Sequence, residues 1–260
     1  MTPAEYIRRK SIYPVALTTE QVDALSQEFR EASAWIVGQN EAYIIAAYYR
    51  AAAKLAEGKL SATEARRLVR ETLRAAGYQG ASSLAEGSLS TPTQGPKKWI
   101  PLGYGTARQR LILETNVNKA AGYAWHESVR GDVGNPAQEL VRFENAREPR
   151  DWKTRWRNAW AGLPASEKRK ALPDRMIALT DCAIWRALSR WGDPYPPFDY
   201  NSGMDVVPVD YETAVSLGLL REGEEPERGE SAGFGYKREL PAGEPSVNAD
   251  IEAWIKEALQ

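Results

Sequence analysis

The stretch Trp191–Val206, with the sequence WGDPYPPFDYNSGMDV, constrains the fold of this chain more than any other. Its three prolines are incompatible with a helix interior or a central strand, because proline fixes φ and lacks a backbone N–H group. The Pro196–Pro197 pair favours extended backbone before it, and Asn201–Gly203 supplies residues typical of turns. We therefore expect an ordered connection that acts as a structural clasp rather than as a place where chemistry happens. The aromatic side chains expected to hold it on the core are Trp191, Tyr195, Phe198 and Tyr200.

The composition narrows the classes of function. The chain has 260 residues and a formal net charge of -1, so it is long enough for one large or two small domains, and any nucleic-acid contact must come from a local patch. Cys182 and His126 are the only residues of their types, which excludes an internal disulfide and a multi-cysteine or histidine-rich metal site. We expect no cofactor. The sequence shows neither a long apolar run nor a secretion signal, so we expect synthesis in a reducing cytoplasm and no membrane partner.

Hydrophobic spacing predicts a helical N-terminal region over residues 1–80. Residues 1–17 are expected to form an extended arm. Apolar residues at helical spacing predict a helix over residues 19–60, with Gly38 as a point where it can bend or break. Ser61 and Glu64 have the spacing of a capping box, which opens a second helix that ends at Gly77. Together the two helices predict an antiparallel helical hairpin.

The remaining chain is predicted to contain a core and an arm. Residues 81–104, rich in Gly, Ser, Thr and Pro, are expected to connect the hairpin to a core over residues 105–220. The core patterns predict a strand at 139–145 and helices at 106–131, 150–163, 166–172 and 175–191, with Asp181 as a point where the last helix can restart. A short helix capped by Asp210 follows. Residues 221–260 are interpreted as an acidic flexible arm that ends in a short amphipathic helix, whose apolar face includes Trp254 and Ile255 and is expected to dock on a neighbour. The predicted fold class is α+β, mainly α, with a small β-sheet in the core.

A basic and aromatic stretch in the core admits two interpretations. Trp152, Trp156 and Trp160 recur every four residues and therefore form one stripe along a helix. In one interpretation, the indoles and the nearby cations meet phosphates or an acidic partner. In the other, the indoles belong to the core and the cations lie on its solvated flank. The cations are Arg142, Arg147, Arg150, Lys153, Arg155 and Arg157.

His126 and Cys182 also have a functional and a structural interpretation. His126, near the end of the long predicted helix, could pair with Glu127 or Ser128 as an acid–base group, or could simply pack there beside Trp125. Cys182 stands among apolar residues and is interpreted as a small buried core residue. We expect no catalytic set from these residues.

Three segments, taken in order, resemble a known family. They are RQRLILETNVNKAAGYAW (residues 108–125), ELVRFENAREPRDWKTRW (residues 139–156) and DPYPPFDYNSGMDVVPVDYETAVSLGLL (residues 193–220). Together they resemble the phage head-morphogenesis proteins of the Mu protein F type, also called minor head or minor capsid proteins. Ser202, Gly203 and Met204 stand where that family usually has Cys-Arg-Cys, so the cysteine-dependent role of the segment is not carried over. The positions that match the family pattern are Arg110, Thr115, Asn116, Arg147, Pro149, Arg150, Pro196, Pro197 and Asn201.

The resemblance implies a structural protein of the phage particle. Such a protein is made in the host bacterial cytoplasm and resides in the virion at the portal vertex, where it acts in head assembly and in DNA packaging or delivery. The implied partners are the portal protein, other capsid proteins, further copies of the chain and, through weak contacts, packaged DNA. An alternative is an enzyme that acts on nucleic acid or transfers ADP-ribose, which would need a carboxylate such as Glu144 or Glu148 near Arg142 and Arg150. A third interpretation is a host-side DNA-binding protein.

Overall fold

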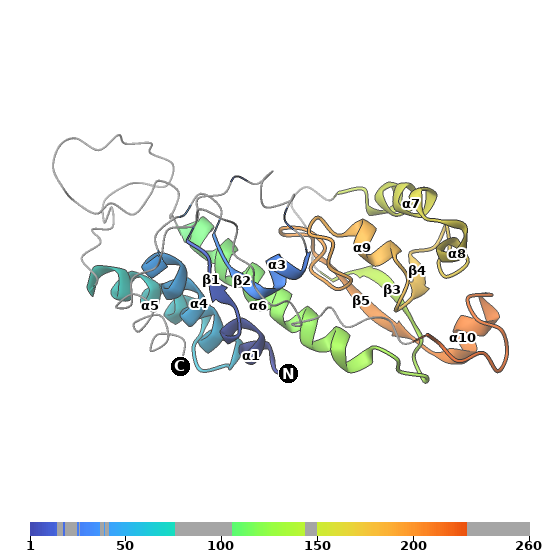
Figure 1. The fold of residues 1–260 in the computed structure, drawn as a ribbon, viewed down its shortest axis with the longest axis horizontal. Helices are drawn as coiled ribbons and strands as arrows, with labels where there is room; N and C mark the ends of the chain where they lie inside the picture. The colour runs from blue at the N-terminus through green and yellow to red at the C-terminus, as the bar shows by residue number, and fades with distance from the viewer. Residues whose placement is uncertain are drawn as a thin grey trace. The chain divides into compact units, whose positions relative to one another are not determined.

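The computed structural model describes residues 1–14, 18, 25, 27–36, 39, 42–75, 106–143 and 150–227. These residues form two compact units, the first ending at Ala120 and the second beginning at Ala121. Figure 1 shows the elements in chain order, and helix α6 (Thr106–Val129) contributes to both units. The predicted connection at 81–104 and the predicted terminal helix lie outside the described residues. The described chain is mainly helical with a small β-sheet, which confirms the predicted fold class.

The predicted helical hairpin is part of the first unit. Helices α4 (Ala42–Ala56) and α5 (Ala62–Ala75) pack against each other and are joined by a short turn at Gly58, whose φ is 69° (Figure 1). The backbone N–H of Ser61 donates to Glu64 Oε2 over 2.7 Å, and the N–H of Glu64 donates to the Ser61 hydroxyl over 3.3 Å. These two bonds confirm the predicted capping box, which satisfies N–H groups at the start of α5.

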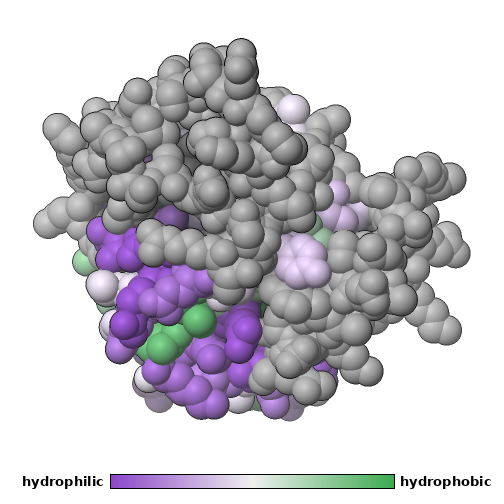
Figure 2. All heavy atoms as spheres, turned by 90° about the vertical axis from the view of Figure 1, so that its left-hand side faces the viewer, coloured by the Kyte–Doolittle hydropathy of each residue, from purple (hydrophilic) through white to green (hydrophobic). Residues whose placement is uncertain are grey.

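Burial differs between the two helices of the hairpin. Ile44, Ile45 and Tyr48 of α4 are at most 1% exposed, and small alanines fill most of the remaining positions of this helix. Helix α5 instead has a narrow buried stripe at Ala65 and Val69, with exposed charged residues around it. Figure 2 looks onto the side where α5 lies in Figure 1, and the described residues there are mostly hydrophilic. Helix α4 is therefore the core helix of this unit, and α5 is a surface helix.

The prediction of an extended arm over residues 1–17 is wrong at the N-terminus, where helix α1 (Pro3–Arg8) forms. The Glu5 N–H donates to the Thr2 hydroxyl over 3.2 Å, and the Glu5 carboxylate accepts from the Thr2 N–H over 2.7 Å. Tyr6 and Ile7 are each 1% exposed, and α1 packs against α4. So short a helix depends on this packing for its stability, and local spacing gave no sign of the packing.

The prediction of a helix over residues 19–60 is also wrong in part. Helix α3 (Gln27–Ala32) is followed directly by strand β2 (Ser33–Ala34), which pairs in parallel with strand β1 (Ser11–Ile12). The partner strand comes from a distant part of the chain. Helical spacing therefore could not reveal that the helix gives way to a strand at Ser33.

The second unit contains a three-stranded antiparallel sheet with the order β4-β3-β5. The central strand β3 (Ala137–Arg142) overlaps the predicted strand at 139–145. It pairs with β5 (Met204–Val209) along its whole length, from Ala137 opposite Val209 to Arg142 opposite Met204. The central strand β3 is therefore flanked by segments that lie far from it in the sequence.

The prediction of a helix over residues 175–191 is wrong at its start, which forms strand β4 (Ile177–Leu179) on the other side of β3. The helix begins only at α9 (Ile184–Leu188). Strand β4 is fully buried, and a short buried strand has the same continuous apolar run as a buried helix. Pairing with β3 decides between these two outcomes.

Each face of the sheet packs against its own helices. Leu140 and Val206 belong to a cluster with helix α7 (Trp152–Gly162) and α9. Ala137 and Val209 belong to a second cluster with helix α10 (Tyr211–Ser216). The alternation of buried positions along β3 and β5 thus gives the sheet two covered faces, as expected for side chains that point to opposite sides.

The other short helices of this unit follow the sequence prediction in part. Helix α8 (Ala165–Lys168) covers only the first part of the helix predicted at 166–172, because Ala171 instead forms an isolated antiparallel β-bridge with Ala178. The backbone N–H of Thr213 donates to Asp210 Oδ1 over 2.8 Å, which confirms Asp210 as the N-cap of α10. A side-chain cap of this kind is a local signal, so the sequence alone was sufficient to find it.

Candidate functional site

The loop Trp191–Gly203, called here the proline loop, is fixed to the core by its aromatic residues. Trp191 is 1% exposed, and Tyr195 and Phe198 are fully buried. The Phe198 ring stacks on Trp185 with ring centroids 5.9 Å apart, and Trp191 meets Tyr200 edge-on at 4.8 Å. These contacts agree with the expectation that aromatic packing orders the loop.

The backbone of the proline loop also contacts helix α6. An ideal Cβ at Gly122 would lie 1.8 Å from the carbonyl oxygen of Pro196, so only glycine fits at this position. At the other end of the loop, Asn201 and Gly203 have φ values of 46° and 62°. Asparagine and glycine tolerate this left-handed region better than other residues, which explains the turn at this point.

These contacts bring together the three segments that carry the family resemblance. Gly122 belongs to the first segment and Pro196 to the third, and β3 of the second segment pairs with β5 of the third. Residues 121–125, 139–143, 150–156 and 193–220 lie in the same compact unit. The fold therefore packs the end of the first segment with the described parts of the second and third segments, whereas residues 108–120 of the first segment belong to the first unit.

The tryptophan stripe lies in this core. Trp152 is 3% exposed and Trp156 is 1% exposed. The indole N–H of Trp156 donates to the Leu172 carbonyl over 2.7 Å, and the indole N–H of Trp160 donates to the Ala171 carbonyl over 3.0 Å. The indoles are therefore packed and largely hydrogen-bonded, and the ring faces of Trp152 and Trp156 are not accessible for stacking on a base.

The cations of the same stretch remain on the surface. Arg142, Arg150 and Lys153 are exposed, and so is the Phe143 ring, which is 64% exposed. Arg157 is also exposed, with its Nε 3.7 Å from Asp174 Oδ1. Arg147, Trp254 and Ile255 lie outside the described residues. Arg155 of the same stretch lies over the Trp152 ring, with its guanidinium carbon 4.7 Å from the ring centroid. The structure thus places the basic residues on the solvated flank of the buried tryptophans, with one of them in a cation–π contact.

Near the start of α6, two side chains at positions that match the family pattern contact other residues of the same helix. Arg110 Nε lies 2.6 Å from Glu114 Oε1, and the Asn116 side chain donates to the Ile112 carbonyl over 2.8 Å. Thr115 is half-buried. These residues belong to the first unit, whereas the other described matching positions belong to the second.

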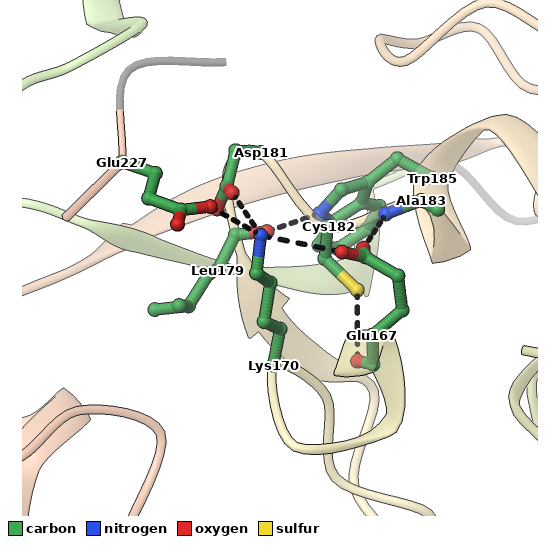
Figure 3. A network of polar contacts seen from close by, with 8 residues as sticks. All are labelled: Glu167, Lys170, Leu179, Asp181, Cys182, Ala183, Trp185 and Glu227. Carbon is green, nitrogen blue, oxygen red and sulfur yellow. Dashed lines mark hydrogen bonds and ion pairs between the residues drawn. The ribbon is translucent and has the colours of Figure 1, made fainter. Parts of the chain in front are cut away.

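A buried ion cluster around Lys170 lies elsewhere in the second unit (Figure 3). Lys170 Nζ lies 2.6 Å from Asp181 Oδ2, 2.8 Å from Glu227 Oε2 and 3.2 Å from Glu167 Oε1. The side chains of Lys170 and Asp181 are only 12% and 7% exposed, whereas that of Glu227 is 72% exposed. Figure 3 shows the three carboxylates converging on the single ammonium group.

Burial and charge fix the protonation states in this cluster. Burial alone would lower the pKa of Lys170, but its carboxylate partners raise that pKa above the ordinary value. Burial raises the pKa of Asp181, although the lysine opposes this shift, and Lys170 lowers the pKa of Glu227. Lys170 therefore remains a cation near neutral pH and cannot act as a nucleophile or general base there.

Cys182 packs beside the cluster as a core residue. It is 2% exposed, and burial raises the pKa of its thiol to about 12. Its neighbour Ala183 donates a backbone N–H to Glu167 Oε2 over 2.7 Å, and the Trp185 indole N–H donates to the Leu179 carbonyl over 2.8 Å. A protonated thiol in this position supports the structural interpretation of Cys182.

A cavity of about 220 Å³ adjoins the cluster and is lined in part by His126, Arg130, Arg186 and Glu227. His126 is 3% exposed, and burial lowers its pKa to about 4. The imidazole is therefore neutral at pH 7, and its ring lies 5.8 Å from the Tyr195 ring. His126 thus forms part of the wall of the cavity.

The proposed partners of His126 are bound elsewhere. Glu127 Oε2 lies 3.1 Å from Arg130 Nη2, and the Ser128 hydroxyl donates to the Trp125 carbonyl over 2.6 Å. Neither contact aligns an acid or base on the imidazole. This arrangement supports the interpretation of His126 as a packed residue at the end of α6.

Sequence reasoning did not find the Lys170 cluster. Glu167 and Lys170 are three residues apart in a short polar segment, which is an ordinary spacing for a surface ion pair. Asp181 and Glu227 approach only because β4 and the segment after α10 return to this point. Within the described ranges, no three His, Cys, Asp or Glu side chains are arranged to hold a metal ion. The described helices are also all too short or too polar to cross a membrane.

No protein-family model, curated protein or solved structure matches this chain.

Proposed function

We propose that this chain is a structural minor head protein of a phage particle, of the Mu protein F type, with no catalytic activity. The observation that carries the proposal is the packing of residues 121–125, the end of the first resembling segment, with the second and third segments in one unit. The contact between Gly122 and Pro196 joins the first segment to the third, and the pairing of β3 with β5 joins the second to the third. Such packing is what a shared family core requires, so it supports the resemblance.

The proposed place of the protein is the portal vertex of the virion, after synthesis in the host bacterial cytoplasm. There it contacts the portal protein, other capsid proteins and further copies of itself, and it acts in head assembly and in DNA packaging or delivery. Contacts with packaged DNA are proposed to be weak, because carboxylates such as Asp151 lie among the exposed cations and the chain carries a formal net charge of -1.

The chemistry of the second unit supports a structural role. His126 is neutral and packed, Cys182 is a protonated core thiol, and Lys170 is a paired cation. Each of these reactive residue types is therefore used for packing or for charge pairing. This favours a scaffold over the enzyme alternative.

The proposal is tested on phage particles from the source of this sequence. Mass spectrometry of purified virions should detect the chain, and an affinity-tagged copy should copurify with the portal protein. A genome that encodes Gly122→Asp should yield fewer intact heads, whereas Gly162→Ala should yield normal numbers because nothing lies within 4 Å of the added methyl group. Absence of the chain from purified virions would overturn the proposal.

The enzyme alternative has its own assay. Purified protein at high concentration is incubated with nucleic acid and, separately, with NAD. Strand cleavage or release of nicotinamide that disappears in Glu144→Gln or Glu148→Gln would replace the structural proposal with the enzymatic one.

A further inference from the structure

We propose that copies of this chain associate head to tail through two charged surfaces at opposite ends of the sheet in the second unit. The first surface, the cationic patch, consists of Arg142, Phe143, Arg150 and Lys153. The second surface is the acidic turn, Arg221–Glu227. The cationic patch of one copy binds the acidic turn of the next. The inference deepens the self-association in the proposed function and names the surfaces that carry it.

The cationic patch combines fixed charges with an exposed aromatic ring. Phe143 is 64% exposed, more than any other large hydrophobic residue that the structure describes. Its backbone N–H donates to the Gly203 carbonyl over 2.9 Å, so the residue is held at the end of the sheet. Arg142 Nη2 lies 3.5 Å from the Arg150 carbonyl oxygen, which joins the end of β3 to the start of α7. Aromatic and arginine side chains are the residues most enriched at protein interfaces.

Two described carboxylates near the cationic patch, Asp199 and Asp151, already have partners within the chain. Asp199 Oδ2 accepts from Arg155 Nη1 over 2.9 Å and lies 3.8 Å from Arg150 Nε. Asp151 accepts from the backbone N–H of Thr154 over 3.0 Å as the N-cap of α7. Among the described side chains of this surface, Arg142, Arg150 and Lys153 are exposed cations, and the charges of these two carboxylates offset them only in part.

The acidic turn is ordered before it meets any partner. The Tyr211 hydroxyl accepts from the Gly223 N–H over 2.8 Å and lies 3.3 Å from the Arg221 carbonyl oxygen. At the other end of the turn, Glu227 is bound to Lys170. The backbone is thus held at both ends, and Glu222 and Glu225 remain exposed between them. A preordered surface loses less conformational entropy on binding.

The two surfaces cannot meet within one copy. The acidic turn follows α10, which begins beside the Val209 end of β5, and the Tyr211 N–H donates to the Gly134 carbonyl just before β3 (Figure 1). Arg142, at the opposite end of β3, pairs with Met204. The length of β3 separates the two ends by roughly 17 Å. Complementary charges at opposite ends of one unit produce a head-to-tail contact, which closes into a ring or extends into a filament.

The test uses the purified full-length chain alone, so it does not depend on portal protein or particles. Sedimentation velocity over a wide concentration range should show association at about 0.01 M salt and much less at about 1 M, where the Debye length falls to about 3 Å. Variant X carries Arg142→Glu, Arg150→Glu and Lys153→Glu. Variant Y carries Glu222→Lys and Glu225→Lys. Each variant alone should associate roughly tenfold more weakly than the wild type or worse.

Charge exchange supplies the decisive comparison. An equimolar mixture of X and Y should associate, because each kind of contact then joins opposite charges, and a chain that carries all five substitutions should associate with itself again. Phe143→Ala should weaken association at every salt concentration. Arg157→Glu is the matched control on α7, one turn beyond Lys153, and should associate as the wild type does.

Several outcomes would overturn the inference. They are a wild-type chain that stays monomeric at low salt, a five-substitution chain that does not associate, or a Y variant that associates normally. If X loses binding to a single-stranded oligonucleotide while wild-type copies remain monomeric, the cationic patch serves nucleic acid instead. If the chain does not associate in these experiments but is present in purified virions, only the two proposed surfaces are rejected. If the chain associates as expected but is absent from virions, only the proposed function is rejected.

Discussion

The carbonyl oxygen of Pro196 occupies the space that a side chain at Gly122 would need, since an ideal Cβ there would lie 1.8 Å from that oxygen. The obstacle is backbone and not the end of a flexible side chain, so the loop or the helix must move. We expect Gly122→Ala to lower the free energy of unfolding by about 1–3 kcal/mol, as measured by denaturant unfolding.

Gly162 provides the matched control for Gly122. It is the last residue of α7, and nothing lies within 4 Å of an added Cβ. Gly162→Ala should leave stability unchanged or raise it slightly, because alanine restricts the unfolded chain. Equal losses in the two variants would show that the Pro196 contact does not decide the result.

The proline loop should depend on its buried ring. Phe198 is fully buried and stacks on Trp185, so Phe198→Ala should cost about 3–5 kcal/mol. Phe143→Ala removes the same group from a site that is 64% exposed and should change stability by less than about 0.5 kcal/mol. Thermal unfolding of the two variants compares them directly, and a small loss in Phe198→Ala would contradict the role of the loop as a clasp.

Replacing Lys170 should lower the free energy of unfolding more than replacing its exposed partner Glu227. Lys170→Met leaves the buried Asp181 carboxylate without its cation, which we expect to cost about 3–5 kcal/mol. Glu227→Gln should have a small effect, because solvent screens a side chain that is 72% exposed. Urea unfolding measures both, and similar losses would mean that the exposed pair contributes as much as the buried one.

The folded chain should become less stable as pH is lowered through a window set by its single histidine, His126. Burial lowers the pKa of folded His126 from 6.5 to about 4. The unfolded chain therefore takes up this proton first as pH falls, which favours unfolding. The stabilisation that His126 provides in its neutral form is fully present above about pH 6.5. It is lost as pH falls toward 4, at a rate of up to about 1.4 kcal/mol per pH unit.

His126→Gln is the control for this pH dependence. Burial raises the pKa of Asp181 and Asp205, so these groups act in the opposite sense at low pH, and both proteins share them. The free energy of unfolding of each protein is measured as a function of pH, and the difference between the wild-type and variant curves therefore gives the contribution of His126. Parallel curves from pH 7 to pH 4 would show that the imidazole is protonated as readily in the folded chain as in the unfolded one.

The local signals in the sequence were sufficient for several elements. The capping box at Ser61 and Glu64, the N-cap at Asp210 and the four-residue spacing of the tryptophans each involve residues within one or two helical turns. Such interactions form with neighbours along the chain, so spacing alone identifies them. Thr2 and Glu5 carry the same capping signal, and attention to it would have predicted α1.

Pairing between distant segments is where sequence reasoning failed. Ser33–Ala34 and Ile177–Leu179 lie in runs with helical spacing, yet β1 and β3 recruit them as strands. The hydrogen bonds of a strand are made with another segment, so local propensity yields to the partner that the fold supplies.

The sequence by itself determined the helical character of the chain, the caps of two helices and a proline-rich connection that its aromatic residues would fix to the core. Only the tertiary structure decided that the Pro196 carbonyl packs against Gly122 and that Asp181 and Glu227 join Glu167 and Lys170 in one cluster. It also decided that Trp152 and Trp156 are buried while Arg142, Arg150 and Lys153 stay exposed. The reason is physical. Caps and spacings are properties of neighbouring residues, whereas burial, ion pairing and close backbone contacts depend on which distant segments share the same space.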